Sequence, residues 1–359
     1  MSVEPIGVLT ILLGFICLYL GTGALAKGAI VTAIFGASSA VFIGPANIPP
    51  GHVMLGFLAV GAMTQRRVSA AAIRSLHPNE PGFWFACLAI YGVASAFLMP
   101  RVLTGITEIF PLGTTAFDDT GSTVPLAPGS SNLTQSVYMI ANLLCFVMIV
   151  GVASSRGGFS AALSGLIGYC VANTIFAFAD LATYGTGTQE LLGFMRNARY
   201  TLHTNSEVGG MKRIVGSFTE ASVFARSTLG VFGFMGTLWL CGHRSVLTGT
   251  VAALSLLLII LSTSSTGLAG APVVLCILYA TAIFRLGHGS SARRAATVVF
   301  WAPLLGIAAL LLLLLDPAVS AMIRDYIDMA VLDKAGSTSG IERGSWNVVS
   351  FQNFLDSWD

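Results

Sequence analysis

Two stretches in the second half of the sequence place an arginine beside the pattern of a helix start. Residues 217–220 (SFTE) and 339–342 (SGIE) each have a serine followed three positions later by a glutamate, the spacing of a capping box. Arg213 precedes the first box, and Arg343 follows the second. Free amides, the positive end of the helix dipole and a forked guanidinium all favour oxyanions. The two arginines are therefore candidates for binding a phosphate, although a capping box alone says nothing about a ligand.

Other polar residues near these boxes extend the candidate site. Arg196, Arg199 and Lys212 add positive charge to the stretch before the first box. The residues in the same stretch that could accept a proton as a general base are His203, Glu207 and Glu220. We find no Asp-x-Asp pair of the kind that holds a metal, because Asp118 and Asp119 are adjacent. The sequence therefore predicts chemistry without a metal.

A hydroxyl-rich stretch and a tryptophan complete the candidates. Residues 262–267 (STSSTG), with Ser264 and Ser265 at their centre, form a polar turn at membrane depth. Such a turn either satisfies backbone groups or lines a polar cavity. Trp346 either stacks on a sugar ring or anchors the chain at a membrane interface. Asp180 lies in an apolar run, where an acidic residue is functional by default unless it sits at the interface.

The elements that carry these residues are predicted to be transmembrane helices. The chain is 55% hydrophobic and 9% charged, with a mean hydropathy of +0.81, whereas a soluble domain has about 25% charged residues. Apolar runs occur at 6–25, 30–44, 54–64, 83–103, 137–154, 161–184, 221–241, 246–261, 273–284 and 298–315. We expect an all-α polytopic membrane protein of about ten transmembrane helices in a lipid bilayer, with short helices in its outward-facing loops.

Basic residues in the connections predict the orientation. Four connections between apolar runs fall on one side when the spans alternate, and they carry Arg66, Arg67, Arg74, Arg156, Arg244, Arg285, Arg293 and Arg294. The positive-inside rule makes that side cytoplasmic. Residues 1–315 then form a transmembrane domain whose loops at about 104–136 and 186–220 face outward, and 316–359 form an outward segment. Apolar spacing over 322–331 predicts a helix that either lies on the membrane surface or packs against the bundle.

Composition also limits the partners and cofactors. The net charge of +2 with no basic stripe argues against a nucleic-acid partner. The six cysteines fall in or beside apolar runs without the spacing of a zinc site or a disulfide framework. We therefore expect small buried hydrophobic residues at these positions and no cofactor.

Three stretches together resemble the O-antigen ligase and O-antigen polymerase family of bacterial membrane proteins. They are residues 213–225 (RIVGSFTEASVFA), 262–267 and 339–346 (SGIERGSW). The resemblance implies a glycosyltransferase of the bacterial inner membrane that moves a glycan from undecaprenyl diphosphate to a sugar or lipid acceptor, without a metal, at a periplasmic site. It implies that Arg213 and Arg343 bind the diphosphate. Because both lie beside a predicted helix start and a diphosphate needs several donors, we expect the two arginines to converge on one outward cavity.

The chain departs from that family in two places. Ser265 is followed by Thr266 where the family often has an arginine, and the sequence ends at Asp359 without the family's later His-Asn motif and helices. This predicts either a truncated product or divergence at the end. A transporter or flippase of lipid-linked sugars, and a non-catalytic subunit of a polysaccharide assembly complex, stay open as alternatives. The glycan, the acceptor and the choice between ligation and polymerisation stay open as well.

Overall fold

The computed structural model describes residues 1–44, 46–106, 108–109, 124–200, 202–208, 210–287 and 292–328. Near the C-terminus it also describes residues 344–345, 347–348, 350–352 and 354–355. Most of the described residues are helical. The α-helices are α1 (Pro5–Leu20), α2 (Thr22–Thr32), α3 (Pro50–Met63), α4 (Arg66–Arg74), α5 (Pro81–Val102), α6 (Ser130–Ala153), α7 (Gly158–Thr183), α8 (Ala221–Leu240), α9 (Ser245–Leu261), α10 (Ser265–Arg285), α11 (Ala292–Leu315) and α12 (Pro317–Ile327).

Short strands and one 3-10 helix, η1 (Gln189–Met195), lie in the connections. Strands β1 (Ser2–Val3), β2 (Val41–Ile43) and β3 (Ala46–Ile48) form an antiparallel sheet in that order. Two further antiparallel pairs join β4 (Glu108–Ile109) to β5 (Val124–Pro125) and β6 (Glu207–Val208) to β7 (Met211–Lys212).

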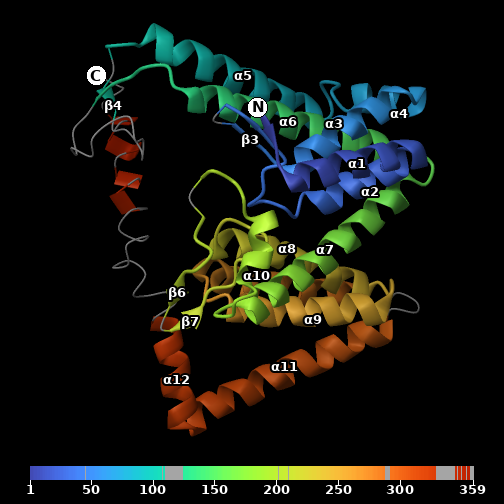
Figure 1. Ribbon diagram of the computed structural model, residues 1–359. Coiled ribbons are helices and arrows are strands. Elements are labelled where there is room, and N and C mark those ends of the chain that lie inside the picture. The colour runs from blue at the N-terminus through green and yellow to red at the C-terminus, as the bar shows by residue number, and fades with distance from the viewer. Residues whose placement is uncertain are drawn as a thin grey trace.

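The helices form two groups joined by α7. In Figure 1 the helices α1 to α6 lie together in the upper half and α8 to α12 in the lower half, with α7 crossing between them. Helix α7 contacts α2 and α6 on one side and α8 and α9 on the other. Small residues allow this close contact: an ideal Cβ on Gly165 of α7 would lie 3.1 Å from the Lys27 Cα of α2. Helix α7 therefore links the two groups, and the loop that follows it begins at its C-terminal end.

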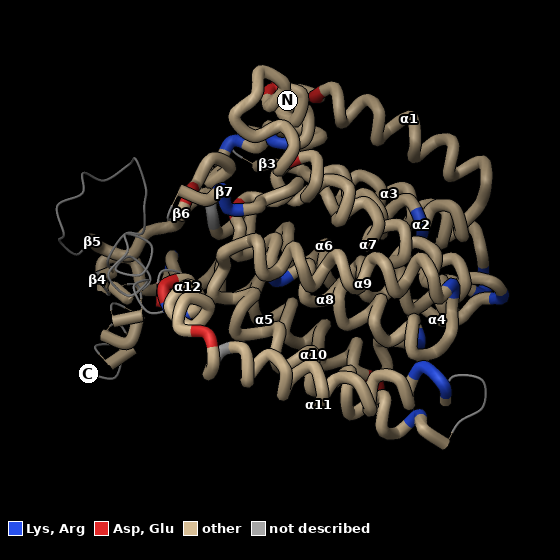
Figure 2. Tube along the Cα trace, turned by 90° about the horizontal axis from the view of Figure 1, so that it is seen from below, with Lys and Arg blue, Asp and Glu red and all other residues tan. Residues whose placement is uncertain are grey.

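The arrangement is that of a multi-pass membrane protein. Within the described residues, six helices are long and apolar enough to cross a bilayer: α5, α6, α7, α8, α10 and α11. Helices α1, α3 and α9 are apolar but shorter, so the count of about ten spans stays a prediction. Figure 2 shows that charged residues gather mainly at two ends of the bundle, with an uncharged middle. We call the end with α4 and the α6–α7, α8–α9 and α10–α11 connections the basic end, and the end with the three-stranded sheet, β6, β7 and α12 the loop end.

The predicted helix over 30–44 is wrong. Helix α1 ends at Leu20 because Gly21 adopts φ 97°, and the short α2 ends at Thr32. Beyond it the Ser38 hydroxyl donates to the Met195 carbonyl, 2.7 Å away, and the Ser39 hydroxyl to the Val41 carbonyl, 3.0 Å away. These contacts hold the chain in an irregular form and lead it into the β2–β3 hairpin. The run is apolar because it is buried under the loop end and not because it spans the membrane.

Two further helices lie outside the apolar runs. Helix α4 is amphipathic and follows the third run, and the sequence analysis missed it. Helix α12 overlaps the helix expected over 322–331 but starts earlier, at Pro317, after Asp316, and residues 329–331 lie outside the described residues. The Asp316 carboxylate accepts from the amides of Ala318 (2.9 Å) and Val319 (3.3 Å). The Tyr326 hydroxyl donates to the Ile260 carbonyl, which attaches α12 to the end of α9.

The orientation leads to a direct prediction about topology. Reporter fusions at Arg156 and Arg293 are expected to be cytoplasmic, and a fusion at Asn205 is expected to lie outside, because the basic end carries the short arginine-rich connections. A phosphatase and fluorescent reporter pair measures both sides. A cytoplasmic signal at Asn205 would contradict this orientation, because it would place the loop between α7 and α8 on the cytoplasmic side of the membrane.

Candidate functional site

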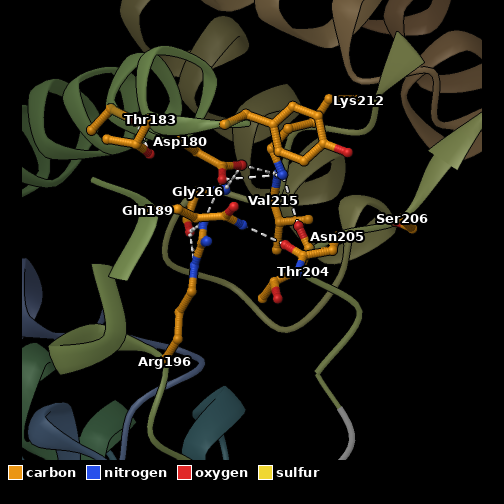
Figure 3. Close-up of polar contacts among 12 residues, drawn as sticks. Asp180, Thr183, Gln189, Arg196, Thr204, Asn205, Ser206, Lys212, Val215 and Gly216 are labelled. Atoms are coloured by element: carbon orange, nitrogen blue, oxygen red, sulfur yellow. Dashed lines mark hydrogen bonds and ion pairs between the residues drawn. The ribbon is translucent and has the colours of Figure 1, made fainter. Parts of the chain in front are cut away.

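A buried carboxylate organises the loop end. Asp180, in the last turn of α7, is 1% exposed. Its Oδ1 forms ion pairs with Arg196 Nη2 at 2.6 Å and Lys212 Nζ at 3.3 Å. Its Oδ2 accepts from the amides of Val215 at 2.8 Å and Gly216 at 3.0 Å, and Figure 3 shows these donors converging on it. A buried carboxylate needs such partners to remain charged. We call Asp180, Arg196, Lys212 and the 215–216 backbone the Asp180 cluster.

Arg196 joins two parts of the loop within this cluster. Its Nε and Nη2 donate to the Gly216 carbonyl at 3.1 and 2.6 Å, while Nη2 also contacts Asp180. Gly216 has φ 58°, a conformation that favours glycine. The arginine therefore fixes a tight turn directly before α8 begins.

Lys212 occupies the other side of the carboxylate. Its Nζ donates to the Thr204 carbonyl at 2.7 Å and lies 4.5 Å from the centre of the Tyr184 ring. Burial lowers the pKa of the Lys212 ammonium, and this effect outweighs the negative charge of Asp180, which raises it. Two cations share one buried carboxylate here, so the cluster holds more positive than negative charge at its centre.

The cluster brings most of the predicted loop residues into one unit. Arg213 is half-buried next to Lys212, and its amide donates to the Ser206 carbonyl at 3.0 Å. The exposed His203 donates its amide to the Thr219 carbonyl at 2.9 Å, beside the half-buried Glu220. Glu207 is opposite Lys212 in the β6–β7 register and accepts from the Tyr184 hydroxyl. Arg213 and the three candidate bases therefore lie between residues 203 and 220 of the folded loop.

The capping box at Ser217 and Glu220 is not formed as predicted. Glu220 is the N-cap of α8 and makes no side-chain capping bond, and its carboxylate accepts from the Ser222 hydroxyl. Ser217 is fully buried and donates to the Ile34 carbonyl at 2.8 Å. The Ala37 amide donates to the Ser217 carbonyl at 3.0 Å. Ser217 joins the loop to the segment after α2, and this long-range contact replaces the local cap.

Arg199 lies apart from the Asp180 cluster. Its guanidinium stacks 4.0 Å from the centre of the Phe42 ring, and its amide donates to the Asn47 side chain at 3.0 Å. The side chain is exposed over the β2–β3 hairpin. Three cations besides Arg213 were predicted to bind substrate. Arg196 and Lys212 form ion pairs with Asp180, whereas the Arg199 guanidinium stacks on the Phe42 ring.

The hydroxyl-rich stretch forms the sharp turn between α9 and α10. Ser262 and Thr263 donate to the backbone carbonyls of Ile259 and Ser262, at 2.7 and 2.9 Å. Thr263 has φ 47°, a strained conformation for a β-branched residue. Ser264 is fully buried at the N-cap of α10, and its hydroxyl has no hydrogen-bond partner among the described residues. Ser265 is half-buried. Backbone satisfaction therefore accounts for the first two hydroxyls but not for Ser264.

This turn lies beside the start of α8. An ideal Cβ on Gly267 would be 3.2 Å from the Ala225 Cβ of α8 and 3.0 Å from Ile259. The α9–α10 turn and the segment that carries Glu220 are thus on the same end of the same helix group. Arg343 and Trp346 lie outside the described residues, and so does their predicted convergence with Arg213.

Sequence analysis overlooked one residue in this region. Arg226 is exposed in the second turn of α8, within a helix apolar enough to span a membrane. A charged residue inside an apolar run is itself a signal of function. It is a further cation on the helix that follows Arg213 and Glu220.

The two cations of the Asp180 cluster are expected to differ in their contribution to stability. Arg196→Met removes the donors to both Asp180 and the Gly216 carbonyl and should lower the melting temperature strongly. Lys212→Met should lower it less, because Asp180 keeps three donors and burial already disfavours the Lys212 charge. Thermal unfolding in detergent measures both. Equal losses, or a larger loss for Lys212→Met, would contradict this ranking.

Together the fold and the site define a helical, multi-pass membrane protein with a cation-rich folded loop at one end. Comparison of the sequence and structure with protein-family models, with curated proteins and with solved structures gives no match. The function therefore has to be argued from the site itself.

Proposed function

We propose that this protein is a membrane glycosyltransferase of a bacterial inner membrane that moves a glycan from undecaprenyl diphosphate to a sugar or lipid acceptor. The observation that carries the proposal is the Asp180 cluster. It fixes the backbone at 215–216, so that Arg213 on one side and Glu220 on the other are held at the entrance to α8. A lipid-linked diphosphate would present its phosphates at this level, because its lipid part stays among the helices.

Arg213 and its surroundings suit the charge that develops in such a reaction. The acceptor hydroxyl attacks the anomeric carbon, the bond from that carbon to the diphosphate oxygen breaks, and the hydroxyl proton passes to a base. Arg213 would bind the leaving diphosphate and stabilise its negative charge. His203 and Glu220, joined through the His203–Thr219 backbone bond, are the candidates for the base, and Glu207 is a third. Arg343, Arg199, Ser264, Ser265 and Trp346 remain proposed substrate contacts.

The large cavities among the helices favour an enzyme over a flippase. A flippase of lipid-linked sugars needs polar or charged groups along a central path. One cavity of about 460 Å³, between α2, α3, α6 and α7, and another of about 920 Å³, between α8, α9, α10 and α11, have no Lys, Arg, Asp or Glu in their linings. The described charged residues gather instead at the ends of the bundle (Figure 2).

A deletion strain tests this proposal in the cell. Compared with its parent, it is expected to lose long or lipid-attached surface glycan and to accumulate glycan linked to undecaprenyl diphosphate on the outer leaflet. Accumulation on the inner leaflet would instead indicate a flippase. An unchanged glycan profile would remove the proposed function.

A further inference from the structure

The basic end contains a polar pocket that the proposed function does not use. It has a volume of about 490 Å³ and lies between α4, the connection to α5 and the last turn of α6. This volume falls within the range of roughly 300–1,000 Å³ typical of small-molecule sites. The residues that line it are Ala70, Ala71, Arg74, Ser75, Glu80, Val150 and Ser154.

The walls of this pocket are firmly held. Helix α4 packs on α6 through Val68, 1% exposed, and Ala72, 2% exposed. The two helices are so close that an ideal Cβ on Gly151 would lie 2.9 Å from the Val68 carbonyl oxygen. The connection after α4 is tied by the bonds from the Ser75 hydroxyl to the Ala72 carbonyl, 2.7 Å, and from the Glu80 amide to the His77 carbonyl, 2.8 Å.

Opposite charges line the pocket without neutralising each other. Arg74 and Glu80 are both exposed, and among the described residues they form no ion pair with one another. The hydroxyls of Ser75 and Ser154 donate to backbone carbonyls, so their oxygens remain able to accept. A ligand that fits has an anionic group for Arg74 and, a short distance away, a cationic donor for Glu80.

The pocket lies where a bilayer presents such a ligand. Helix α6 ends at Ala153 and α5 starts at Pro81, so the pocket is level with the ends of two candidate spans. The apolar Ile73, next to the lining residue Arg74, is 72% exposed, as expected for a side chain that meets acyl chains. Figure 2 places α4 at the basic end of the bundle.

We infer that this pocket binds the headgroup of an ethanolamine phospholipid of the basic-end leaflet, with the phosphate at Arg74 and the primary ammonium at Glu80. A primary ammonium donates hydrogen bonds to a carboxylate and to serine oxygens. A choline headgroup has no such donor, and a glycerol headgroup has no positive charge for Glu80. Arg66 and Arg67 on the same helix attract anionic lipids in general, but Glu80 repels them from the pocket.

Lipid retention by the purified full-length protein tests this inference. The protein is reconstituted in nanodiscs with equal amounts of phosphatidylethanolamine, phosphatidylglycerol and phosphatidylcholine, and native mass spectrometry after extraction counts the retained lipid. We expect one phosphatidylethanolamine retained in preference to the other two. Glu80→Gln should reduce that preference over phosphatidylglycerol by about tenfold, the effect of one charge-assisted hydrogen bond. Arg74→Gln should abolish retention, and Arg244→Gln, on the same end but outside the pocket, should leave it unchanged.

Three results would overturn the inference. Equal retention of phosphatidylglycerol by the parent would mean that the pocket binds anionic lipids in general. An unchanged preference in Glu80→Gln, with the fold confirmed by thermal unfolding, would remove the ammonium contact. Tighter binding of free phosphoethanolamine than of the lipid, compared at equal concentration, would assign the pocket to a soluble zwitterion. Glycan transfer is not measured in any of these experiments, so their failure leaves the proposed function untouched.

Discussion

Asp180→Asn should destabilise the loop end more than any other single change considered for this protein. The substitution keeps the size of the side chain but leaves Arg196 and Lys212 buried without an anion. Breaking a buried ion pair by removing one partner costs roughly 3–5 kcal/mol. Thermal unfolding in detergent and limited proteolysis between 184 and 220 measure the effect, and we expect a lower melting temperature with early cleavage in that loop.

A matched control separates this effect from the loss of any carboxylate at the loop end. Asp316→Asn changes a half-buried cap whose carboxylate accepts from the backbone amides of Ala318 and Val319, and asparagine caps a helix about as well as aspartate. It should leave both measurements unchanged. If Asp180→Asn were as stable and as protease-resistant as this control, the cluster would not organise the loop.

Arg213→Ala should abolish glycan transfer while the protein remains folded and inserted. Removing one donor to a developing oxyanion typically lowers a rate by about 100- to 1,000-fold. Arg213→Lys should recover only part of the activity, because an ammonium cannot make the bidentate contact of a guanidinium. Product formation from a lipid-linked glycan, measured at matched protein levels, tests both variants.

Arg324→Ala serves as the control for this prediction. Arg324 is an exposed cation on α12, at the same end of the bundle but outside the Asp180 cluster. Its loss should leave transfer unchanged. Full activity in Arg213→Ala would remove this arginine from the mechanism, whereas an equal loss in both variants would point to a general effect of charge at the loop end.

Long apolar runs in the second half of the chain predicted their helices closely. The run at 221–241 became α8, Ala221–Leu240, and the run at 246–261 became α9, Ser245–Leu261. Such runs succeed because a bilayer requires continuous apolar length, a local property. The prediction of helix boundaries in the first 48 residues failed, because these residues are apolar nearly throughout. The helices there end where the backbone of Gly21 changes direction and where residues 195–217, distant in sequence, contact the chain.

The candidate site was predicted in composition but not in connectivity. The sequence singled out the loop cations and, separately, Asp180, and it could not show that Arg196 and Lys212 neutralise that carboxylate across 16 and 32 residues. Ser217 failed as a cap for the same reason, since its partner Ile34 is 183 residues away. Short-range patterns identify residue types that can do chemistry, while folding decides which of them are used to hold the loop.

The central proposal is tested most directly by reconstitution. The purified protein in liposomes is given a radiolabelled glycan on undecaprenyl diphosphate together with candidate sugar and lipid acceptors, and both the transferred glycan and the released undecaprenyl diphosphate are measured. We expect equal amounts of the two products from the parent, and neither from Arg213→Ala. Movement of the intact labelled donor across the bilayer, with no undecaprenyl diphosphate released, would contradict the proposal and identify a flippase instead.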